Sequence, residues 1–564
     1  PEGEQSASTL KNAFFTLQAD YSKDLSTTQD ADHKDNLFNY GYVGKFTAER
    51  DTVLSNPWNF DETADFYMID DNGDSLFVTG EAIGHIDEEG NFVYDFSQSV
   101  NPISNYYFEA GEINPYATNY TQQYYDYLGE SAIITDLNEI RSIGALVNGD
   151  RSDYVYSAFY NTGREYNGYN KSVETQLRFT GSASADINDH AIQFGFEYEQ
   201  RDDRYYGVGP TGLWSLAEQR VNNYINQFQG AYELLGYDDA SQTTLLGLNH
   251  SFNFDQMSDF ATNFREVNGI AHDQIVDIHS YDPEDLDISM FSADQIMNYA
   301  TWYGFDYTGA RIEGVQPGMA EFLKSDGNEN YKREVGAFQP IYVSGYIQDK
   351  FAFEDLIFNI GVRVDRYDAN QEVLLDKYSL YQVITVGEDD IYDHPDNIGD
   401  DYVIYVDDNA NHSKVTGYRN GDNWYDENGL PITDPEILNV SGRVMPMLLN
   451  PGAINNEVDA LNKGLTADAF TDYTPQVTFM PRISFNFPIS DEAMFYAHYD
   501  VLSQRPSGNR MDPIDYLQWA QLSGTYVSNA DLKPQRTTDY EIGFKQTLSS
   551  SSAMEISAFY KEMR

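Results

Sequence analysis

Hydrophobic and polar residues alternate with a period of two along several stretches of this chain. In 356–365 every even position is apolar, and most odd positions are polar. The apolar positions are Leu356, Phe358, Ile360, Val362 and Val364. Successive side chains of a β-strand point to opposite faces, so this pattern predicts a strand between two different environments. The alternation recurs in 173–183, 192–199, 482–489 and 540–545, whereas no extended stretch repeats with the helical period of 3.6.

The connections between these strands fall into two classes of very different length. Four are tight polar turns, at 186–190, 353–355, 488–492 and 549–552. The others are long and acidic, at about 51–140, 201–338 and 366–478. A soluble sandwich would show turn signals throughout, whereas short turns at one end and long loops at the other are typical of outer-membrane barrels. The prediction is therefore an all-β, antiparallel transmembrane β-barrel, of which this span is a part.

Aromatic residues gather beside the predicted short turns. Phe351 and Phe353 flank one turn. Phe485 and Phe487 precede another, and Phe495 and Tyr496 follow it. Aromatic residues favour strands in general, but membrane barrels also place them in girdles at the water–lipid interface. Their position beside the turns favours girdles.

Composition and charge exclude several classes of protein. The 564 residues carry 34 Lys and Arg against 91 Asp and Glu, a formal net charge of −57. Because nucleic acids and anionic surfaces require a basic patch, we expect no nucleic-acid partner. An aromatic content of 15% argues against disorder. The absence of cysteine excludes disulfides, thiolate metal sites and cysteine nucleophiles.

Candidate chemistry is sparse, and we expect no enzyme and no cofactor. The 207–212 segment (GVGPTG) fits a dinucleotide motif but lacks its strand–helix context, so it is interpreted as a loop. Asp422 and Asp426 are weak calcium candidates, for which a solvated turn is the simpler interpretation. Glu197 and Glu199 share a strand face and are interpreted as a hydrated lumen wall, while Arg363 and Asp365 are expected to pair with each other or with neighbouring strands.

Three stretches resemble the barrel of TonB-dependent outer-membrane receptors. The first is 342–365 (YVSGYIQDKFAFEDLIFNIGVRVD), a strand, a tight turn and a strand closing in Gly-x-Arg-x-Asp. Its matching positions are Tyr346, Gln348, Asp349, Lys350, Gly361, Arg363 and Asp365. The second contains Pro481 and Arg482, followed by Arg505 and Pro506.

The third stretch is 529–544 (NADLKPQRTTDYEIGF), which carries Leu532, Lys533, Pro534, Glu541 and Gly543. It departs from the family pattern at Gln535, where these receptors usually have Glu. Residues 38–46 (FNYGYVGKF) and 190–201 also resemble the large Oar-like receptors of the Bacteroidota.

The resemblance implies a 22-stranded barrel occluded by a plug, with the long loops outside the cell and the strands in outer-membrane lipid. It implies a receptor that binds a solute at the cell surface and imports it with energy from TonB and its inner-membrane motor. We expect the plug and the closing strands to lie outside residues 1–564, in a longer polypeptide. The alternative is a surface adhesin or a structural subunit of a larger outer-membrane assembly, with a surface lipoprotein or another subunit as partner.

Overall fold

The computed structural model describes most of the chain as two compact units. It covers residues 10–50, 103–129, 133–152, 158, 166–226, 251–325, 330–408, 414–439, 444–449, 465–522 and 527–564, with short strands within 53–94 and 233–247. The first unit is Pro1–Ser26, Ser172–Tyr206 and Trp302–Arg564, and the second is Thr27–Lys171 and Gly207–Thr301. Within the described ranges, no helix is long and apolar enough to cross a membrane.

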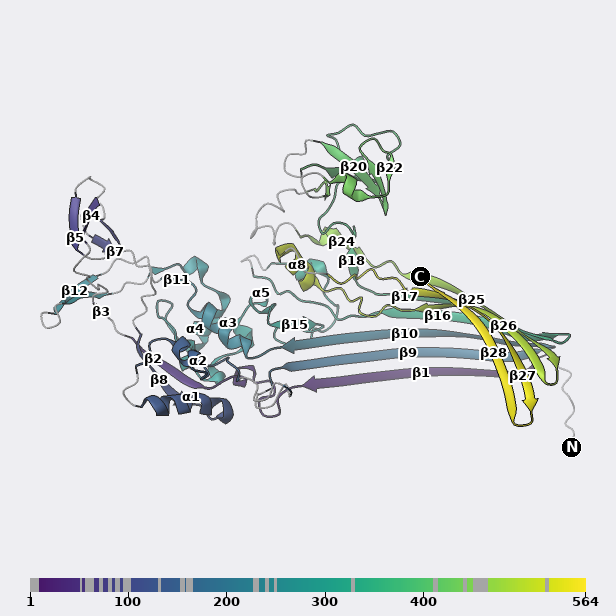
Figure 1. Cartoon of the computed structure of the whole chain (residues 1–564), viewed down its shortest axis with the longest axis horizontal. Coiled ribbons are helices and arrows are strands. Elements are labelled where there is room, and N and C mark those ends of the chain that lie inside the picture. Colours follow the sequence, from purple (N-terminus) through teal and green to yellow (C-terminus); the bar gives the residue numbers. More distant parts are fainter. Residues whose placement is uncertain are drawn as a thin grey trace. The chain divides into compact units, whose positions relative to one another are not determined.

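A large sheet of long strands dominates the first unit (Figure 1). Its strands are β1 (Leu10–Thr28), β9 (Tyr169–Ile187), β10 (His190–Val208), β16 (Ile341–Phe353), β17 (Leu356–Asp368), β25 (Gln476–Ser490), β26 (Ala493–Gln504), β27 (Gln535–Ser549) and β28 (Ser552–Met563), in that spatial order. The ladders from β10 to β28 are antiparallel. The predicted antiparallel fold is thus confirmed, and the described strands form an open sheet with β1 and β28 at its edges.

All four predicted tight turns are present. Two residues separate β9 from β10, β16 from β17, β25 from β26 and β27 from β28. Each of these pairs is adjacent in the sheet, as hairpins require. The connections from β1 to β9, from β10 to β16 and from β17 to β25 contain the three long segments. A fourth long connection, residues 505–534, joins β26 to β27 and was not predicted.

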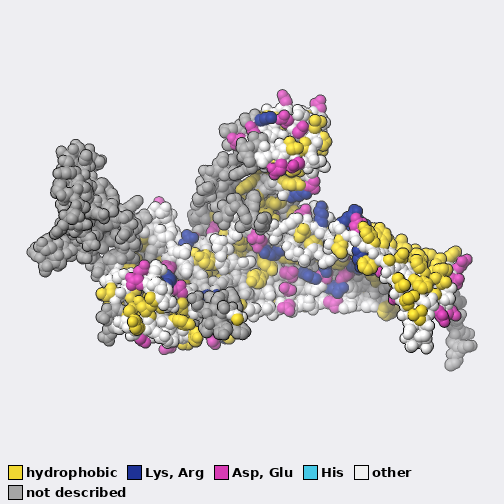
Figure 2. All heavy atoms as spheres, viewed as in Figure 1, with side chains coloured by type: hydrophobic (Ala, Val, Ile, Leu, Met, Phe, Trp, Pro, Cys, Tyr) yellow, Lys and Arg dark blue, Asp and Glu magenta, His cyan; other side chains and the backbone are white. Residues whose placement is uncertain are grey.

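The register places most of the strongly apolar positions of neighbouring strands on one face of the sheet. Ile360 lies opposite Ile483, which lies opposite Tyr499. The row continues through Tyr540 to Tyr560, with ring centroids 5.0 and 6.2 Å apart. Many of these side chains are exposed, including Phe194, Ile347, Ile360, Phe479, Ile483, Ile542 and Ile556. Figure 2 shows hydrophobic side chains crowded over the β25–β28 part of the sheet.

The aromatic side chains beside the short turns form a continuous strip on this apolar face. The Phe351 ring lies 5.4 Å from Phe358, Phe358 lies 6.4 Å from Phe485, and Phe485 lies 6.0 Å from Phe495. Tyr496 is an exception to the predicted girdle. It lies on the opposite, polar face because its neighbour Phe495 occupies the apolar one.

Aromatic rings on the strands cover three glycines of the sheet. A Cβ atom added to Gly195 would lie 2.6 Å from the Tyr346 ring, and one added to Gly543 would lie 2.2 Å from the Tyr496 ring. A Cβ atom added to Gly181 would lie 2.3 Å from the Phe196 ring. A glycine on one strand therefore leaves room for an aromatic side chain of the neighbouring strand to lie along the sheet. This packing fixes the register between the two strands.

The second unit contains helices that the sequence analysis missed. Its elements include β2 (Gly44–Arg50), β8 (Ile103–Ala110), α1 (Pro115–Leu128), α2 (Leu137–Ser142), α3 (Gly212–Val221), α4 (Asp259–Asn268) and α5 (Ala293–Ile296). Val43, Phe46, Ile134, Ile140 and Val147 form a core beneath α1 and α2.

The signals for these helices lie at their ends rather than in their periodicity. Pro115 occupies the first turn of α1 and Gly129, at φ 74°, ends it. Ser258 caps α4 by accepting from the Ala261 N–H, and Gly269 ends that helix in the left-handed region.

The 366–478 segment, expected to be irregular, contains a small folded sheet. It is formed by β22 (Pro431–Ile432), β21 (Asn423–Asp426), β20 (Val415–Asn420), β19 (Val403–Val406) and β23 (Met445–Pro446), in that order. Ile404, Val406, Tyr418 and Met447 are buried within it. A two-residue turn at Gly421, φ 57°, joins β20 to β21, so the acidic run around it forms a hairpin.

Arginine on the apolar face should destabilise the barrel, whereas arginine on the polar face should not. We predict that Ile360→Arg lowers the free energy of unfolding by about 2–4 kcal/mol if Ile360 lies near the bilayer midplane. Asn359→Arg is the matched control, because residue 359 is adjacent and lies on the opposite face. Urea unfolding in lipid vesicles measures both, and equal losses would contradict the assignment of the two faces.

A methyl group at Gly195 should also be costly, because it would collide with Tyr346 and the Gly181 carbonyl oxygen. We expect Gly195→Ala to cost about 1–3 kcal/mol, as overpacking does. At Gly345, on the next strand, the nearest atom to an added Cβ is 3.8 Å away, so Gly345→Ala should be tolerated. Thermal unfolding of the two variants tests this, and a tolerated Gly195→Ala would argue against the ring-over-glycine packing.

Candidate functional site

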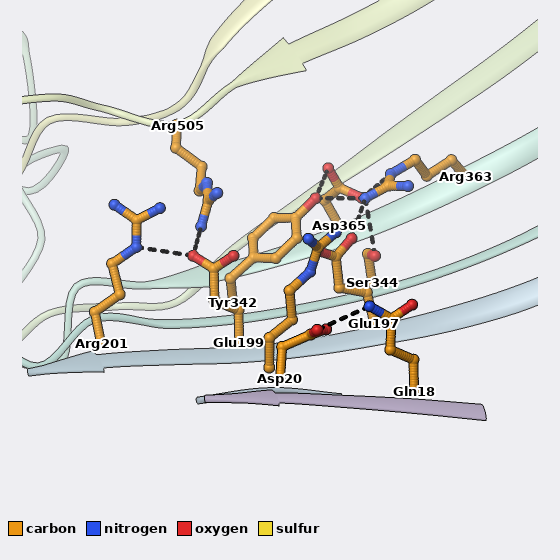
Figure 3. A network of polar contacts seen from close by, with 11 residues as sticks. Gln18, Asp20, Glu197, Glu199, Arg201, Tyr342, Ser344, Arg363, Asp365 and Arg505 are labelled. Atoms are coloured by element: carbon orange, nitrogen blue, oxygen red, sulfur yellow. Dashed lines mark hydrogen bonds and ion pairs between the residues drawn. The ribbon is translucent and has the colours of Figure 1, made fainter. Parts of the chain in front are cut away.

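The polar face of the sheet carries a connected network of charged side chains (Figure 3). Its members come from β9, β10, β16 and β17 and from the loop after β26. They are Arg178, Glu197, Glu199, Arg201, Tyr342, Ser344, Arg363, Asp365 and Arg505. The strand period of two brings them together, because each strand directs its alternate residues to this face.

Arg363 is the centre of one half of the network. Its Nε donates to Asp365 Oδ1 at 2.7 Å, and its Nη2 donates to the Tyr342 hydroxyl at 2.7 Å and to Ser344 Oγ at 2.9 Å. The Tyr342 hydroxyl in turn donates to Asp365 Oδ2 at 2.5 Å. The predicted pairing of Arg363 with Asp365 is therefore confirmed, and a tyrosine completes it.

Glu199 is the centre of the other half. Its Oε1 accepts from Arg201 Nε at 2.9 Å and from Arg505 Nη1 at 2.7 Å. The Glu199 side chain is only 4% exposed, so two guanidinium groups compensate one buried carboxylate. The Arg505 guanidinium also lies 4.5 Å from the centre of the Tyr342 ring, which links the two halves.

The network gives the polar face a nearly neutral charge within a very acidic protein. The network contains four guanidinium groups and three carboxylates. The third carboxylate, Glu197, accepts from Arg178 at 2.7 Å and lies 3.5 Å from Arg363. Each carboxylate is held by at least one arginine, so Glu197 and Glu199 are not poised as an acid–base pair. The arrangement provides a charged wall, held by ion pairs and hydrogen bonds, that can contact a polar molecule or segment.

A cavity of about 260 Å³ adjoins the wall. Its lining includes Tyr342, Asp365, Tyr367, Gln476, Arg505 and Pro534. Two of these residues, Arg505 and Pro534, belong to loop stretches that resemble the receptor family. Loop residues from distant parts of the sequence therefore meet the strand wall at this cavity.

The sequence-predicted residues fall into three groups in the structure. Tyr346, Gln348, Lys350, Gly361, Arg363, Asp365, Arg482, Glu541 and Gly543 share the polar face. Asp349 and Pro481 lie on the apolar face, where Asp349 Oδ2 contacts His190 Nδ1 at 2.7 Å. Arg505, Pro506, Leu532, Lys533 and Pro534 lie between strands, and the Leu532 carbonyl accepts from the Tyr473 hydroxyl at 3.1 Å.

Sequence reasoning missed Tyr342, Ser344, Arg178 and Arg201 as partners in the network. These residues occupy the alternate positions of their strands that point to the polar face, and this alternation was the available signal that they share a face. Alternation alone does not give the register between strands, and the register decides which side chains contact one another.

The two calcium candidates take part in local structure. Asp426 Oδ1 accepts the N–H groups of Asn428 and Leu430, which closes a turn. Hydrogen bonds from Lys377 and from the Tyr378 hydroxyl hold the pKa of Asp422 below its usual range. Within the described residues, no group of three or more His, Asp and Glu side chains is placed to hold a metal ion. Calcium binding stays a prediction, and the geometry favours the solvated turn.

Residues 146–564 match the family model described as "TonB dependent receptor-like, beta-barrel". The chain belongs to this family. Members of the TonB-dependent receptor family form β-barrels of the outer membrane, which agrees with the two faces of the sheet. No curated protein sequence matches the chain.

The chain is also similar to solved TonB-dependent receptors at low sequence identity. The copper transporter OprC is 9% identical, with a TM-score of 0.26, and 70% of this chain covers 31% of it. The alcaligin outer-membrane receptor FauA from Bordetella pertussis is 8% identical, with a TM-score of 0.22, and 70% of this chain covers 30% of it. The ferric-catecholate import receptor Fiu from K12 E. coli is 12% identical, with a TM-score of 0.21, and the match covers 70% of this chain and 41% of Fiu. The chain therefore spans well under half the length of these receptors.

Removing Arg363 should destabilise the receptor, because Asp365 and Tyr342 would lose their common donor. We predict that Arg363→Met costs about 2–3 kcal/mol. Arg366→Met is the matched control, since Arg366 pairs with Asp368 at the same spacing on the same strand. The Arg366 side chain is 43% exposed against 28% for Arg363, so its pair should contribute less than about 1 kcal/mol.

Chemical unfolding of both variants measures the difference. The double variant Arg363→Met/Asp365→Leu should lose less than the sum of the two single changes, because it removes both charges together. Strict additivity would show that the network is not coupled.

Proposed function

We propose that the chain is the barrel portion of an outer-membrane receptor that binds a solute at the cell surface and imports it with TonB-coupled energy. Membership of the TonB-dependent receptor family supports this proposal. The observation that carries it is the contrast between the two faces of one sheet. An exposed apolar face suits outer-membrane lipid, and the charged wall on the opposite face suits a hydrated lumen.

The orientation follows from the two kinds of connection. The short turns would lie in the periplasm, and the long segments would lie outside the cell, as in bacterial barrels. The folded sheet within 366–478 would then be an extracellular module, available to a solute, a surface lipoprotein or another outer-membrane subunit. TonB and its inner-membrane motor would act on a plug from elsewhere in the protein.

Two finer parts of the proposal rest on resemblance. Residues 38–46 and 190–201 support assignment to the large Oar-like receptors of the Bacteroidota. The family motif residues on the polar face, such as Arg363 and Asp365, would act by fixing the lumen wall rather than by chemistry. The proposal includes no enzymatic step and no cofactor.

Energised uptake is the test of this function. Cells that make the whole receptor and cells that lack it would be incubated with a defined mixture of ferric siderophores, corrinoids, oligosaccharides and peptides. Mass spectrometry would follow the depletion of each solute from the medium. We expect at least one solute to disappear only when the receptor is made and only in cells that have TonB.

Two controls make the result specific. A proton uncoupler should stop the depletion, because the inner-membrane gradient drives TonB. Depletion that continues in cells without TonB would overturn energised import, and an unchanged mixture with correctly inserted receptor would favour the adhesin or assembly role instead.

A further inference from the structure

A second cavity, of about 600 Å³, lies at the loop end of the sheet within the first unit. Its lining comes from residues 316–318 and 335–339, from the end of β17, from β18 (Glu372–Leu374) and β24 (Phe470–Asp472), and from the start of α8 (Pro513–Leu522). The Phe470 ring of β24 lies 5.4 Å from the Tyr516 ring of α8, and β18 pairs with β24, so these elements lie side by side (Figure 1). The volume is that of a site for a small organic ligand.

Each amide side chain in this lining donates at least one hydrogen bond within the protein. Gln316 donates to the Gly314 carbonyl, Gln339 to Asp202 at 2.6 Å, and Asn370 to the Gln339 carbonyl at 2.9 Å. Gln371 donates to the carbonyls of Asn509 and Ala530. Gln371 uses both of its amide hydrogens in this way, and each of the other three side chains uses one.

Carboxylates outnumber basic side chains in the lining of this cavity. Arg510 is its one basic side chain, and it donates to Asp512 at 2.5 Å and lies 4.1 Å from the centre of the Tyr303 ring. Asp368, Glu372 and Asp472 supply carboxylates, of which Asp368 accepts from Arg366 at 3.0 Å. Glu372 and Asp472 lie directly opposite each other in the β18–β24 ladder, an arrangement of like charges that is unfavourable without a cation or a donor beside it.

We infer that this cavity binds an organic cation that carries amino groups, such as a basic peptide or a polyamine. This inference rests on the proposed function and names the class of solute. Ammonium groups offer only donors, and the carboxylates of this lining are acceptors. The net charge of −57 favours the same class, because an acidic surface concentrates cations and repels anions.

Equilibrium binding to the whole receptor, purified from outer membranes in a neutral detergent, tests the inference. Isothermal titration calorimetry at 0.15 M salt, where long-range fields are screened, would compare four probes. Trilysine and spermidine represent the two sources of amino groups. Fully N-acetylated trilysine and triglutamate are the neutral and anionic controls.

A double variant and a matched charge control locate the binding. Glu372→Gln/Asp472→Asn keeps the shape of the cavity and lets residue 372 still accept from the Met319 N–H. Asp390→Asn removes a charge from an exposed residue that does not line the cavity. We expect trilysine or spermidine to bind and the double variant to weaken that binding about tenfold or more, with Asp390→Asn within twofold of the parent.

The outcomes distinguish a basic peptide from a polyamine, and they include the results that would overturn the inference. Binding of trilysine alone indicates a basic peptide, and binding of spermidine alone indicates a polyamine. Failure of both cations to bind, equal binding of acetylated trilysine, or an unchanged affinity in the double variant would overturn the inference. None of these results bears on TonB-dependent uptake of another solute, which tests the proposed function separately.

Discussion

Backbone hydrogen bonding is the constraint on which the rest of this structure depends. A strand that crosses a bilayer must pair its N–H and C=O groups with neighbouring strands, because lipid offers no partner. In the described sheet each inner strand from β10 to β27 has a partner on both sides. Since the pairing fixes the register, it also fixes which side chains share a face. The apolar surface and the charged wall are two consequences of one ladder.

The charged wall shows how that ladder supports a polar interior. Guanidinium and carboxylate groups from three strands and one loop meet without leaving a buried charge alone. Buried ion pairs contribute little net stability but are costly to break, so such a network fixes geometry more than it stabilises. A wall of this kind has a fixed geometry, and the cavity beside Arg505 and Tyr342 lies at its edge.

Period-two alternation predicted strands at β9, β10, β17, β25 and β27 and the two faces of the sheet, and the short polar segments between strands predicted the tight turns. It also predicted that Arg363 pairs with Asp365, since residues two apart on a strand share a face. It could not predict that Tyr342 and Arg505 complete the site, because those contacts depend on register and on a loop far away in sequence. The helices of the second unit were missed because short segments such as α1 carry their signal in Pro115 and Gly129 rather than in a long repeat. The hairpin at Gly421 was hidden by acidic residues that suggested a loop.

The most direct test of the central claim is site-directed spin labelling along β17 in the whole receptor in outer-membrane vesicles. Residues 1–564 contain no cysteine, so single cysteines introduced at successive positions from 356 to 368 meet no other label site within them, and the unsubstituted receptor measures any background from the rest of the protein. Collision rates with oxygen, which partitions into lipid, and with a water-soluble nickel chelate would be measured at each position. The account predicts that the ratio of the two rates alternates with a period of two, with oxygen favoured at Phe358, Ile360 and Val362. A ratio that is constant along the strand would contradict it.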